Sequence, residues 1–297
     1  MRKISIAVAQ MACGRDRGDN IAKATDLVRE AASRGARIVV LQELFETPYF
    51  CIDKDETHFA EATPVADNPA IRAMRALAER LDVVIPVSFF EAAGERRFNS
   101  LAMIDAGGAL LGIYRKSHIP DFPCYEEAFY FDPGDTGPMV FETKYGRVGG
   151  AVCWDQWFPE AARVMVLKGA EILVYPTAIG RDSNAPDHMS RRHWWHAMQG
   201  HAAANMVIVA AANRVGVERG KADQIAFYGG SFIANQFGDR VGEGGEGDGE
   251  IVVQSFDLDA VADFRRRWGI FRTRRPDLYG PIIQAVPRDL LDDPAGS

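Results

Sequence analysis

Two stretches of the chain are repeated, and this repetition limits the fold more than any other feature of the sequence. RGARIVVLQE (residues 34–43) resembles KGAEILVYPT (residues 168–177), and ALAERLDVVIPVS (residues 76–88) parallels AAANMVIVAAAN (residues 202–213). Each stretch reads as the end of a helix followed by a short apolar strand. We therefore expect one α/β domain, residues 1–297, of two α-β-α-β halves whose sheets pack face to face as a four-layer α-β-β-α sandwich.

The repeat also indicates where a functional site belongs. It places Glu43 and Thr177 at equivalent strand ends, and Cys153 follows another apolar strand in GGAVCWDQWFPEAARVMV. Ligands of α/β proteins usually bind at the carboxyl ends of strands. We therefore expect these three positions to lie near one site.

The composition argues against several classes of protein. The net charge of −7 does not suit a protein that binds nucleic acid, which needs a basic face. No apolar run approaches the roughly 20 residues that cross a bilayer, and the N-terminal stretch reads as a strand instead of a signal peptide. We expect neither a nucleic-acid partner nor a membrane span.

The spacing of the cysteines singles out one of them. Cys13, Cys51, Cys124 and Cys153 form no C-x-x-C pair, so neither a zinc site nor a redox motif is indicated, and a reducing cytoplasm fits the chain. Only Cys153 stands between a buried strand and a helix, which we expect to begin at Pro159. A helix N-terminus favours a thiolate nearby. Cys153 is therefore the candidate nucleophile.

Two charged residues at strand ends supply the rest of a catalytic group. Glu43 follows the apolar run RIVVLQ, where partial burial would raise its pKa and suit it to move protons; it is a better base candidate than His118. Lys116 ends LLGIYRK and could stabilise an oxyanion together with the backbone N–H of Trp154.

A metal site is not expected. His188, His193, His196 and His201 are spaced by 5, 3 and 5 residues, which does not give the i, i+4 pair of a zinc-binding helix. The proposed chemistry needs no metal, and we expect no cofactor.

The motifs resemble those of the nitrilase, or carbon–nitrogen hydrolase, superfamily. The matching stretches are LQELFETPYF with Glu43, YRKSHIP with Lys116 and VCWDQWFPEAAR with Cys153, and the similarity extends over almost the whole chain. The resemblance implies an αββα sandwich with a Glu–Lys–Cys triad at these positions. It also implies a second, assisting glutamate, for which Glu127 in YEEAFYFDPGD matches better than Glu126.

The same resemblance implies cysteine-dependent hydrolysis of an N-carbamoyl amine. The expected substrate is N-carbamoylputrescine, hydrolysed to putrescine, carbon dioxide and ammonia in polyamine biosynthesis. The alternatives are N-carbamoyl amino acids such as 3-ureidopropionate, or a simple ω-amide; a non-enzymatic scaffold is a third. We expect Tyr49, Trp154 and Thr177 to contact the substrate.

The charged residues near the expected site are compatible with two kinds of substrate, one with an ammonium group and one with a carboxylate. Five acidic residues lie in segments near the proposed mouth and could bind an ammonium: Asp121, Glu126, Asp132, Asp155 and Asp187. An arginine could instead pair with a substrate carboxylate, and Arg181, Arg191 and Arg192 lie in the same region.

The C-terminal segment, residues 265–297, is rich in Arg and Pro and is expected to be mostly irregular. The resemblance implies a homodimer or a larger homo-oligomer, and this segment is expected to reach a partner subunit.

Overall fold

The computed structural model describes residues 1–182 and 190–284. Its first sheet has the strand order β15-β1-β2, continued by β3-β4-β5. A parallel bridge from Ile38 to Val84 joins the two sets, with Val39 N donating to Val84 O at 3.0 Å. The strands are β15 (Ile251–Asp257), β1 (Lys3–Ala9), β2 (Ile38–Val40), β3 (Ile85–Ala93), β4 (Arg96–Ile104) and β5 (Leu110–Arg115).

The second sheet repeats the first in order and direction. Its order is β14-β13-β10-β8-β7-β6, and read backwards it gives the same sequence of antiparallel and parallel neighbours. The strands are β6 (Met139–Thr143), β7 (Gly146–Gly150), β8 (Ile172–Pro176), β10 (Ile208–Ala212), β13 (Phe232–Ala234) and β14 (Arg240–Glu243). The predicted equivalence of β2 with β8, and of β3 with β10, is confirmed by their matching places in the two sheets.

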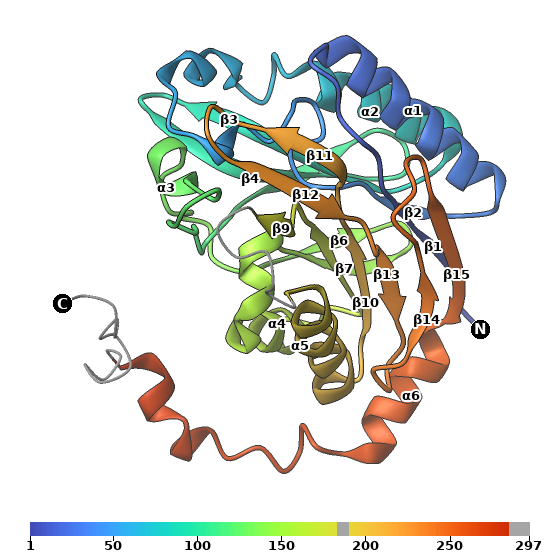
Figure 1. The fold of residues 1–297 in the computed structure, drawn as a ribbon. Coiled ribbons are helices and arrows are strands. Elements are labelled where there is room, and N and C mark those ends of the chain that lie inside the picture. Colours follow the sequence, from blue (N-terminus) through green and yellow to red (C-terminus); the bar gives the residue numbers. More distant parts are fainter. Residues whose placement is uncertain (183–189, 285–297) are drawn as a thin grey trace.

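Two helices cover the outer face of each sheet (Figure 1). The first pair is α1 (Arg17–Ser33) and α2 (Pro69–Leu81), and the second is α4 (Pro159–Leu167) and α5 (Ser190–Asn205). Side chains alternate along β1, so that Ile6 and Val8 join the core between the sheets while Ala7 and Ala9 face the helical layer. The predicted four-layer sandwich is confirmed.

A small third sheet stands over one end of the sandwich. Its order is β11-β12-β9, with β9 (Gly180–Asp182), β11 (Val215–Arg219) and β12 (Gln224–Tyr228). The sequence patterns did not predict these strands. The remaining elements of the described chain are the short helix α3 (Glu127–Tyr130) and five 3₁₀ helices. Three of these precede α6, at Phe50–Ile52, Glu56–Glu61 and Cys153–Trp157, and two follow it, at Pro276–Leu278 and Gly280–Ile283.

The C-terminal segment is less irregular than expected. Residues 265–268 belong to α6 (Leu258–Trp268), and the Arg265 guanidinium donates to Met206 O and Ala170 O. After α6 the chain runs away from the body of the molecule (Figure 1). In the described part of the chain, no helix is both long enough and apolar enough to cross a membrane.

Candidate active site

Cys153 occupies a strained position after strand β7. Its φ of 41° lies in the left-handed region, which a residue with a side chain adopts only at a cost. It begins the 3₁₀ helix Cys153–Trp157, so the helix that starts at Pro159 is separated from the thiol by this turn. The element that begins at Cys153 is therefore this 3₁₀ turn, and not the helix N-terminus that was expected to favour its thiolate. The residue is 4% exposed.

Three charged side chains from the first half form a fully buried cluster. Glu43 follows β2, Lys116 follows β5, and Glu127 is the first residue of α3; all three side chains are 0% exposed. The Lys116 ammonium donates to Glu43 Oε1 at 2.9 Å and to Glu127 Oε2 at 2.6 Å. Glu127 is thus in the cluster, whereas Glu126 pairs with Lys54 at 2.8 Å, nearer the surface.

Neutral side chains add further hydrogen bonds to the cluster. Asn99 Nδ2 donates to Glu43 Oε1 at 2.7 Å, and the Tyr49 hydroxyl donates to Glu127 Oε1 at 2.7 Å. Among the described residues, the second oxygen of Glu43, Oε2, is buried without a hydrogen-bond partner. A buried carboxylate oxygen with an open lone pair can accept a proton.

The pKa directions define the resting protonation state. Burial alone would lower the pKa of Lys116, but the carboxylates of Glu127 and Glu43 outweigh it and raise that pKa well above its usual value. Burial and the charge of Glu43 raise the pKa of the Cys153 thiol well above its usual range, against the effect of Lys116. Burial also raises the pKa of Glu127, although Lys116 opposes it. The resting site thus holds an ammonium and a protonated thiol.

Asp155 supports the turn that carries Cys153. Its carboxylate accepts hydrogen bonds from Val152 N at 3.0 Å, from the Tyr114 hydroxyl at 2.7 Å and from His118 N at 3.0 Å. The side chain is fully buried, so the expectation that Asp155 lies at a substrate mouth is wrong. Its hydrogen bonds hold the turn against the rest of the fold.

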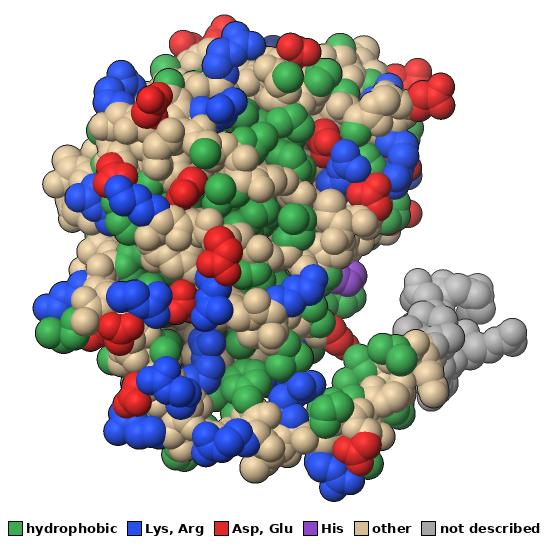
Figure 2. Space-filling model, turned by 180° about the vertical axis from the view of Figure 1, so that it is seen from behind, with side chains coloured by type: hydrophobic (Ala, Val, Ile, Leu, Met, Phe, Trp, Pro, Cys, Tyr) green, Lys and Arg blue, Asp and Glu red, His purple; other side chains and the backbone are tan. Residues whose placement is uncertain are grey.

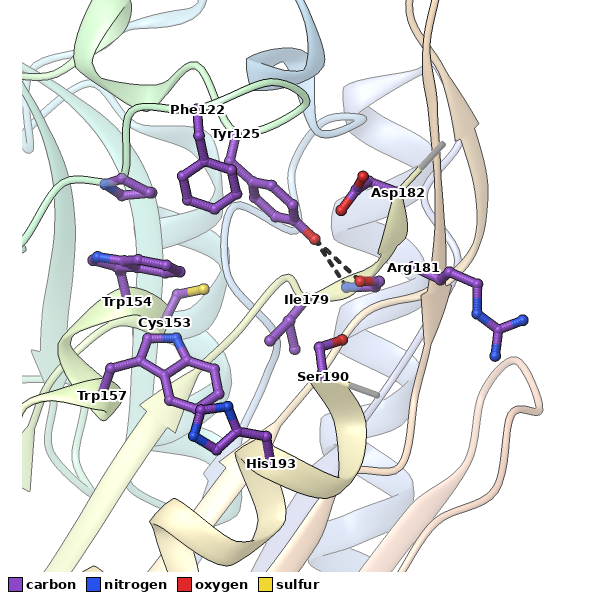
Figure 3. Close-up of a pocket in the computed structure, with 12 residues that line it drawn as sticks. Phe122, Tyr125, Cys153, Trp154, Trp157, Ile179, Arg181, Asp182, Ser190 and His193 are labelled. Carbon is purple, nitrogen blue, oxygen red and sulfur yellow. Dashed lines mark hydrogen bonds between the residues drawn. The ribbon is translucent and has the colours of Figure 1, made fainter. Parts of the chain in front are cut away.

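A cavity of about 450 Å³ opens on the Cys153 sulfur. Phe122, Tyr125, Trp154 and Trp157 supply aromatic walls, and the thiol points toward the space between them (Figure 3). Its other lining residues are Pro120, Ile179, Gly180, Arg181, Asp182, Ser190 and His193. Glu43, Lys116 and Glu127 do not line the cavity, but their charges are close enough to act on the pKa of the Cys153 thiol.

The three expected substrate contacts have different positions. Trp154 lines the cavity. Tyr49 and Thr177 are buried outside its lining: Tyr49 supports Glu127, and the Thr177 hydroxyl donates to Gln156 Oε1 at 3.3 Å and to Tyr175 O at 3.1 Å. The two strand ends that were predicted to be equivalent lie next to each other, because Glu43 N donates a hydrogen bond to Thr177 O at 3.4 Å.

Asp182 is the acidic residue of the cavity wall, and sequence reasoning missed it. Its carboxyl group faces the cavity in Figure 3, whereas the Arg181 side chain points away. Arg191 pairs with Glu246 at 2.8 Å, and the exposed Arg192 is outside the lining.

The other acidic candidates lie elsewhere. Asp132 accepts a hydrogen bond from Arg97 N at 3.1 Å, and Asp121 is exposed and is not a lining residue. Asp187 falls outside the described residues. These positions leave Asp182 as the acidic group of the wall in the described chain.

The histidines are spread over separate surroundings. The His193 ring lies 4.7 Å from the Trp157 ring at the cavity, tilted by 44°, and His201 Nε2 lies 2.7 Å from Gln156 O. His196 is exposed, and His188 is outside the described residues. Within residues 1–182 and 190–284, no group of three or more His, Cys, Asp or Glu side chains is arranged to hold a metal ion.

Comparison with known proteins gives matches over nearly the whole chain. The model of the carbon–nitrogen hydrolase family matches residues 5–266. N-carbamoylputrescine amidase of Arabidopsis thaliana is 53% identical over 286 residues, 95% of this chain and 96% of the relative. Citrullinase of Francisella tularensis subsp. tularensis (strain SCHU S4 / Schu 4) is 44% identical over 284 residues, 96% of this chain and 99% of the relative. The crystal structure of a carbon–nitrogen hydrolase from Helicobacter pylori G27 matches with a TM-score of 0.90 at 37% identity, covering 96% of this chain and 100% of that chain.

Proposed function

The chain belongs to the carbon–nitrogen hydrolase family, and from that premise we propose that it hydrolyses the ureido group of N-carbamoylputrescine to putrescine, carbon dioxide and ammonia. The relative of A. thaliana at 53% identity supports this substrate and a place in polyamine biosynthesis. The observation that carries the chemistry is the buried Glu43–Lys116–Glu127 cluster, whose charges act on the Cys153 thiol at the wall of a cavity.

Cys153 acts as nucleophile with Glu43 as its base. The open oxygen of Glu43 takes the thiol proton, and the sulfur attacks the carbonyl carbon of the ureido group. The carbon–nitrogen bond breaks as Glu43 returns the proton to the departing nitrogen. A water molecule then attacks the carbonyl carbon of the S-carbamoyl intermediate and gives its proton to Glu43, which passes it to the departing sulfur of Cys153. The carbamic acid released by this step decomposes to carbon dioxide and the second nitrogen product, so that both carbon–nitrogen bonds of the ureido group are broken.

Lys116 and the N–H of Trp154 stabilise the oxyanion. Burial lowers the pKa of Lys116, but the two neighbouring carboxylates raise it by more, so Lys116 keeps its positive charge. Trp154 is the second residue of a 3₁₀ helix, where an N–H has no partner within the helix. Each such donor is worth about 3–4 kcal/mol to the transition state. Glu127 positions the ammonium and is itself held by Tyr49.

The cavity suits a short chain with a cationic end. Trp154 and Phe122 can pack along methylene groups, and Asp182 can pair with the ammonium so that its charge is not left without a counter-ion. The relative named citrullinase favours a second candidate, a ureido amino acid. Arg181 does not support it, because its side chain turns away from the cavity (Figure 3).

The deciding measurement is kcat/KM for N-carbamoylputrescine, 3-ureidopropionate and L-citrulline under identical conditions. We expect N-carbamoylputrescine to exceed each of the others by at least about 10²-fold, which is about 2.7 kcal/mol of transition-state binding. An equal or better value for either carboxylate-bearing compound would overturn the cationic substrate. Cys153→Ala, which should lose activity by about 10⁴-fold while it still folds, shows that any turnover belongs to this thiol.

The role of Asp182 has its own control in a neutral substrate. Asp182→Asn should lower kcat/KM for N-carbamoylputrescine and leave n-butylurea, which has no ammonium, nearly unchanged. Asp121→Asn, at an exposed position outside the cavity lining, should affect neither compound. Equal losses of kcat/KM for both compounds would show that Asp182 does not bind the substrate ammonium.

The assembly and location belong to the same proposal. A homodimer or larger homo-oligomer in the reducing cytoplasm suits a chain whose four cysteines are all free thiols. The segment after α6, whose described part contacts little of its own body, is the part proposed to reach a partner subunit.

A further inference from the structure

Arg214 is a fully buried cation for which the mechanism above has no use. It lies between β10 and β11, is 0% exposed and does not line the cavity. Its Nη2 donates to Glu43 O at 3.0 Å and to Leu44 O at 2.8 Å. Its Nη1 donates to Thr47 O at 3.0 Å and to Glu218 Oε1 at 2.7 Å. One guanidinium therefore binds three carbonyl groups of the loop that begins with the proposed base.

The loop is also held at its other end and at its strained point. Tyr49 N donates to the Glu218 carboxylate, which pairs with Arg214, and the Tyr49 hydroxyl reaches Glu127. Leu44 has a φ of 47°, in the left-handed region, and its N–H donates to Ser88 Oγ at 3.1 Å. The backbone from the proposed base to Tyr49 is thus fixed in a conformation that a free loop would leave.

The Arg214–Glu218 ion pair is better suited to positioning the loop backbone than to stabilising the fold. A buried ion pair gains little over an apolar pair of the same size, because removing both charges from water offsets their attraction. A planar guanidinium, by contrast, reaches several acceptors in fixed directions, which a lysine ammonium does not reproduce. The Arg214 guanidinium also lies 5.6 Å from the Phe227 ring centroid, which limits its orientation from another side.

We infer that Arg214 and Glu218 form a positioning pair that holds the backbone of Glu43, so that its open Oε2 meets the Cys153 thiol. The inference rests on the proposed role of Glu43 as the base. The pair touches neither the cavity nor the reacting atoms in the described chain, so it acts through Glu43 and its effect belongs in kcat.

The test compares Arg214→Lys and the double variant R214M/E218M with the wild type, using N-carbamoylputrescine. The double variant removes both charges together, so it keeps the core neutral and allows the chain to fold. We expect kcat to fall by about 10²-fold in both variants, as for a small displacement of a reacting group. KM should stay within about threefold, because the binding wall is untouched.

A pH profile separates positioning from simple loss of structure. A smaller folded fraction scales the whole profile of kcat/KM against pH without moving it, whereas a displaced base moves the acid limb. We expect the acid limb to move in R214M/E218M while circular dichroism at the assay temperature matches the wild type. A low but unmoved profile, or a kcat within about threefold of the wild type, would overturn the inference.

The double variant R17M/E46M is the matched control, because it also removes both charges of an ion pair of this loop. Arg17 pairs with Glu46 in the same loop but is not bonded to the backbone of Glu43. The control variant should leave kcat within about threefold; a loss equal to that of R214M/E218M would show that general order of the loop matters, and not the Arg214 contacts. Glu43→Gln separates the two proposals: if it keeps full activity, the base assignment fails whatever Arg214 does.

Discussion

At the scale of single residues, the site depends on one buried positive charge between two carboxylates. Lys116, Glu43 and Glu127 are all fully buried, so the ammonium is what makes two nearby negative charges tolerable in the interior. Removing one partner of such a group leaves uncompensated charge and is far more costly than never having had the group. Stability and catalysis are therefore linked at Lys116.

Lys116→Met should lower the free energy of unfolding by about 3–5 kcal/mol at pH 8, and by much less at pH 5. Burial already raises the pKa of Glu127 above its value of 4.5 in an unfolded chain, and loss of the lysine raises it further. An acid with a raised pKa in the folded state stabilises at low pH, and this stabilisation is lost as pH rises through that pKa. Urea denaturation at the two pH values measures the difference.

Lys144→Met is the control for this prediction. Lys144 pairs with Asp82 at 2.8 Å on the surface, where both side chains are about half exposed. Exposed pairs contribute about 0–1 kcal/mol. A loss in the Lys144 variant as large as in the Lys116 variant, or an absence of pH dependence in the latter, would contradict the role given to the buried cluster.

Glu43→Gln and Lys116→Ala should each reduce kcat by about 10²–10⁴-fold, and the double variant should lose much less than the product. The two side chains are joined by a 2.9 Å hydrogen bond and act on the same tetrahedral intermediate. Steady-state kinetics of the two single variants and the double variant gives the coupling. Losses that multiply cleanly would mean that the two residues work independently.

The sequence predicts the role of a residue when the pattern that marks it lies in the neighbouring positions, and not when its partners are far away along the chain. Cys153, Glu43 and Lys116 stand directly after apolar runs, so a charge or thiol at a strand end is visible locally. Arg214 has no such signal, because its acceptors at Glu43 and Leu44 are separated from it by 171 and 170 positions. Its role needed the packing of the two halves.

At the scale of elements, β9, an edge strand of the small β11-β12-β9 sheet, supplies part of the cavity wall through Gly180, Arg181 and Asp182. The strand β9 has three residues and starts with glycine, so neither period nor propensity marks it in the sequence. Gly180 lies where a Cβ would come within 2.5 Å of Ala226 O and 2.6 Å of Ile225 Cγ2. This close approach is what brings Ile179 and Asp182 to the cavity.

Gly180→Ala should therefore displace β9 from β12. We expect a loss of about 1–3 kcal/mol in stability from overpacking, and a fall of about tenfold or more in kcat/KM as the wall moves. Thermal unfolding and steady-state kinetics provide the two measurements.

Gly200→Ala is the matched control in α5. A Cβ there meets no atom within 4 Å, and alanine in a helix interior is favoured over glycine by about 1 kcal/mol. This variant should be slightly more stable and fully active. A Gly180 variant that behaves in the same way would show that β9 tolerates the extra carbon.

At the scale of the whole molecule, the segment after α6 leaves several large apolar side chains exposed to solvent. Leu278, Ile282 and Ile283 are 61%, 58% and 89% exposed. Six arginines and one aspartate lie in residues 265–284, while the whole chain has a net charge of −7. Lys and Arg gather around α6 and the segment that follows it (Figure 2). A basic segment with apolar side chains suits the acidic surface of a second copy.

The double substitution I282D/I283D should lower the oligomer mass measured by light scattering, because two charges replace apolar contacts. Leu111→Asp, at another exposed leucine on β5, should leave the mass unchanged. If I282D/I283D assembles like the wild type, the segment does not hold the subunits together.

The raised pKa of Cys153 also has a consequence for damage by oxidants. Peroxide reacts with the thiolate, and sulfenic acid forms most readily at exposed cysteines of low pKa. The resting enzyme presents the opposite, a protonated thiol that is 4% exposed and whose pKa burial and Glu43 raise. A thiolate arises only while Glu43 holds its proton. Peroxide should therefore inactivate this enzyme slowly, and faster only where substrate turnover leaves the sulfur as a thiolate.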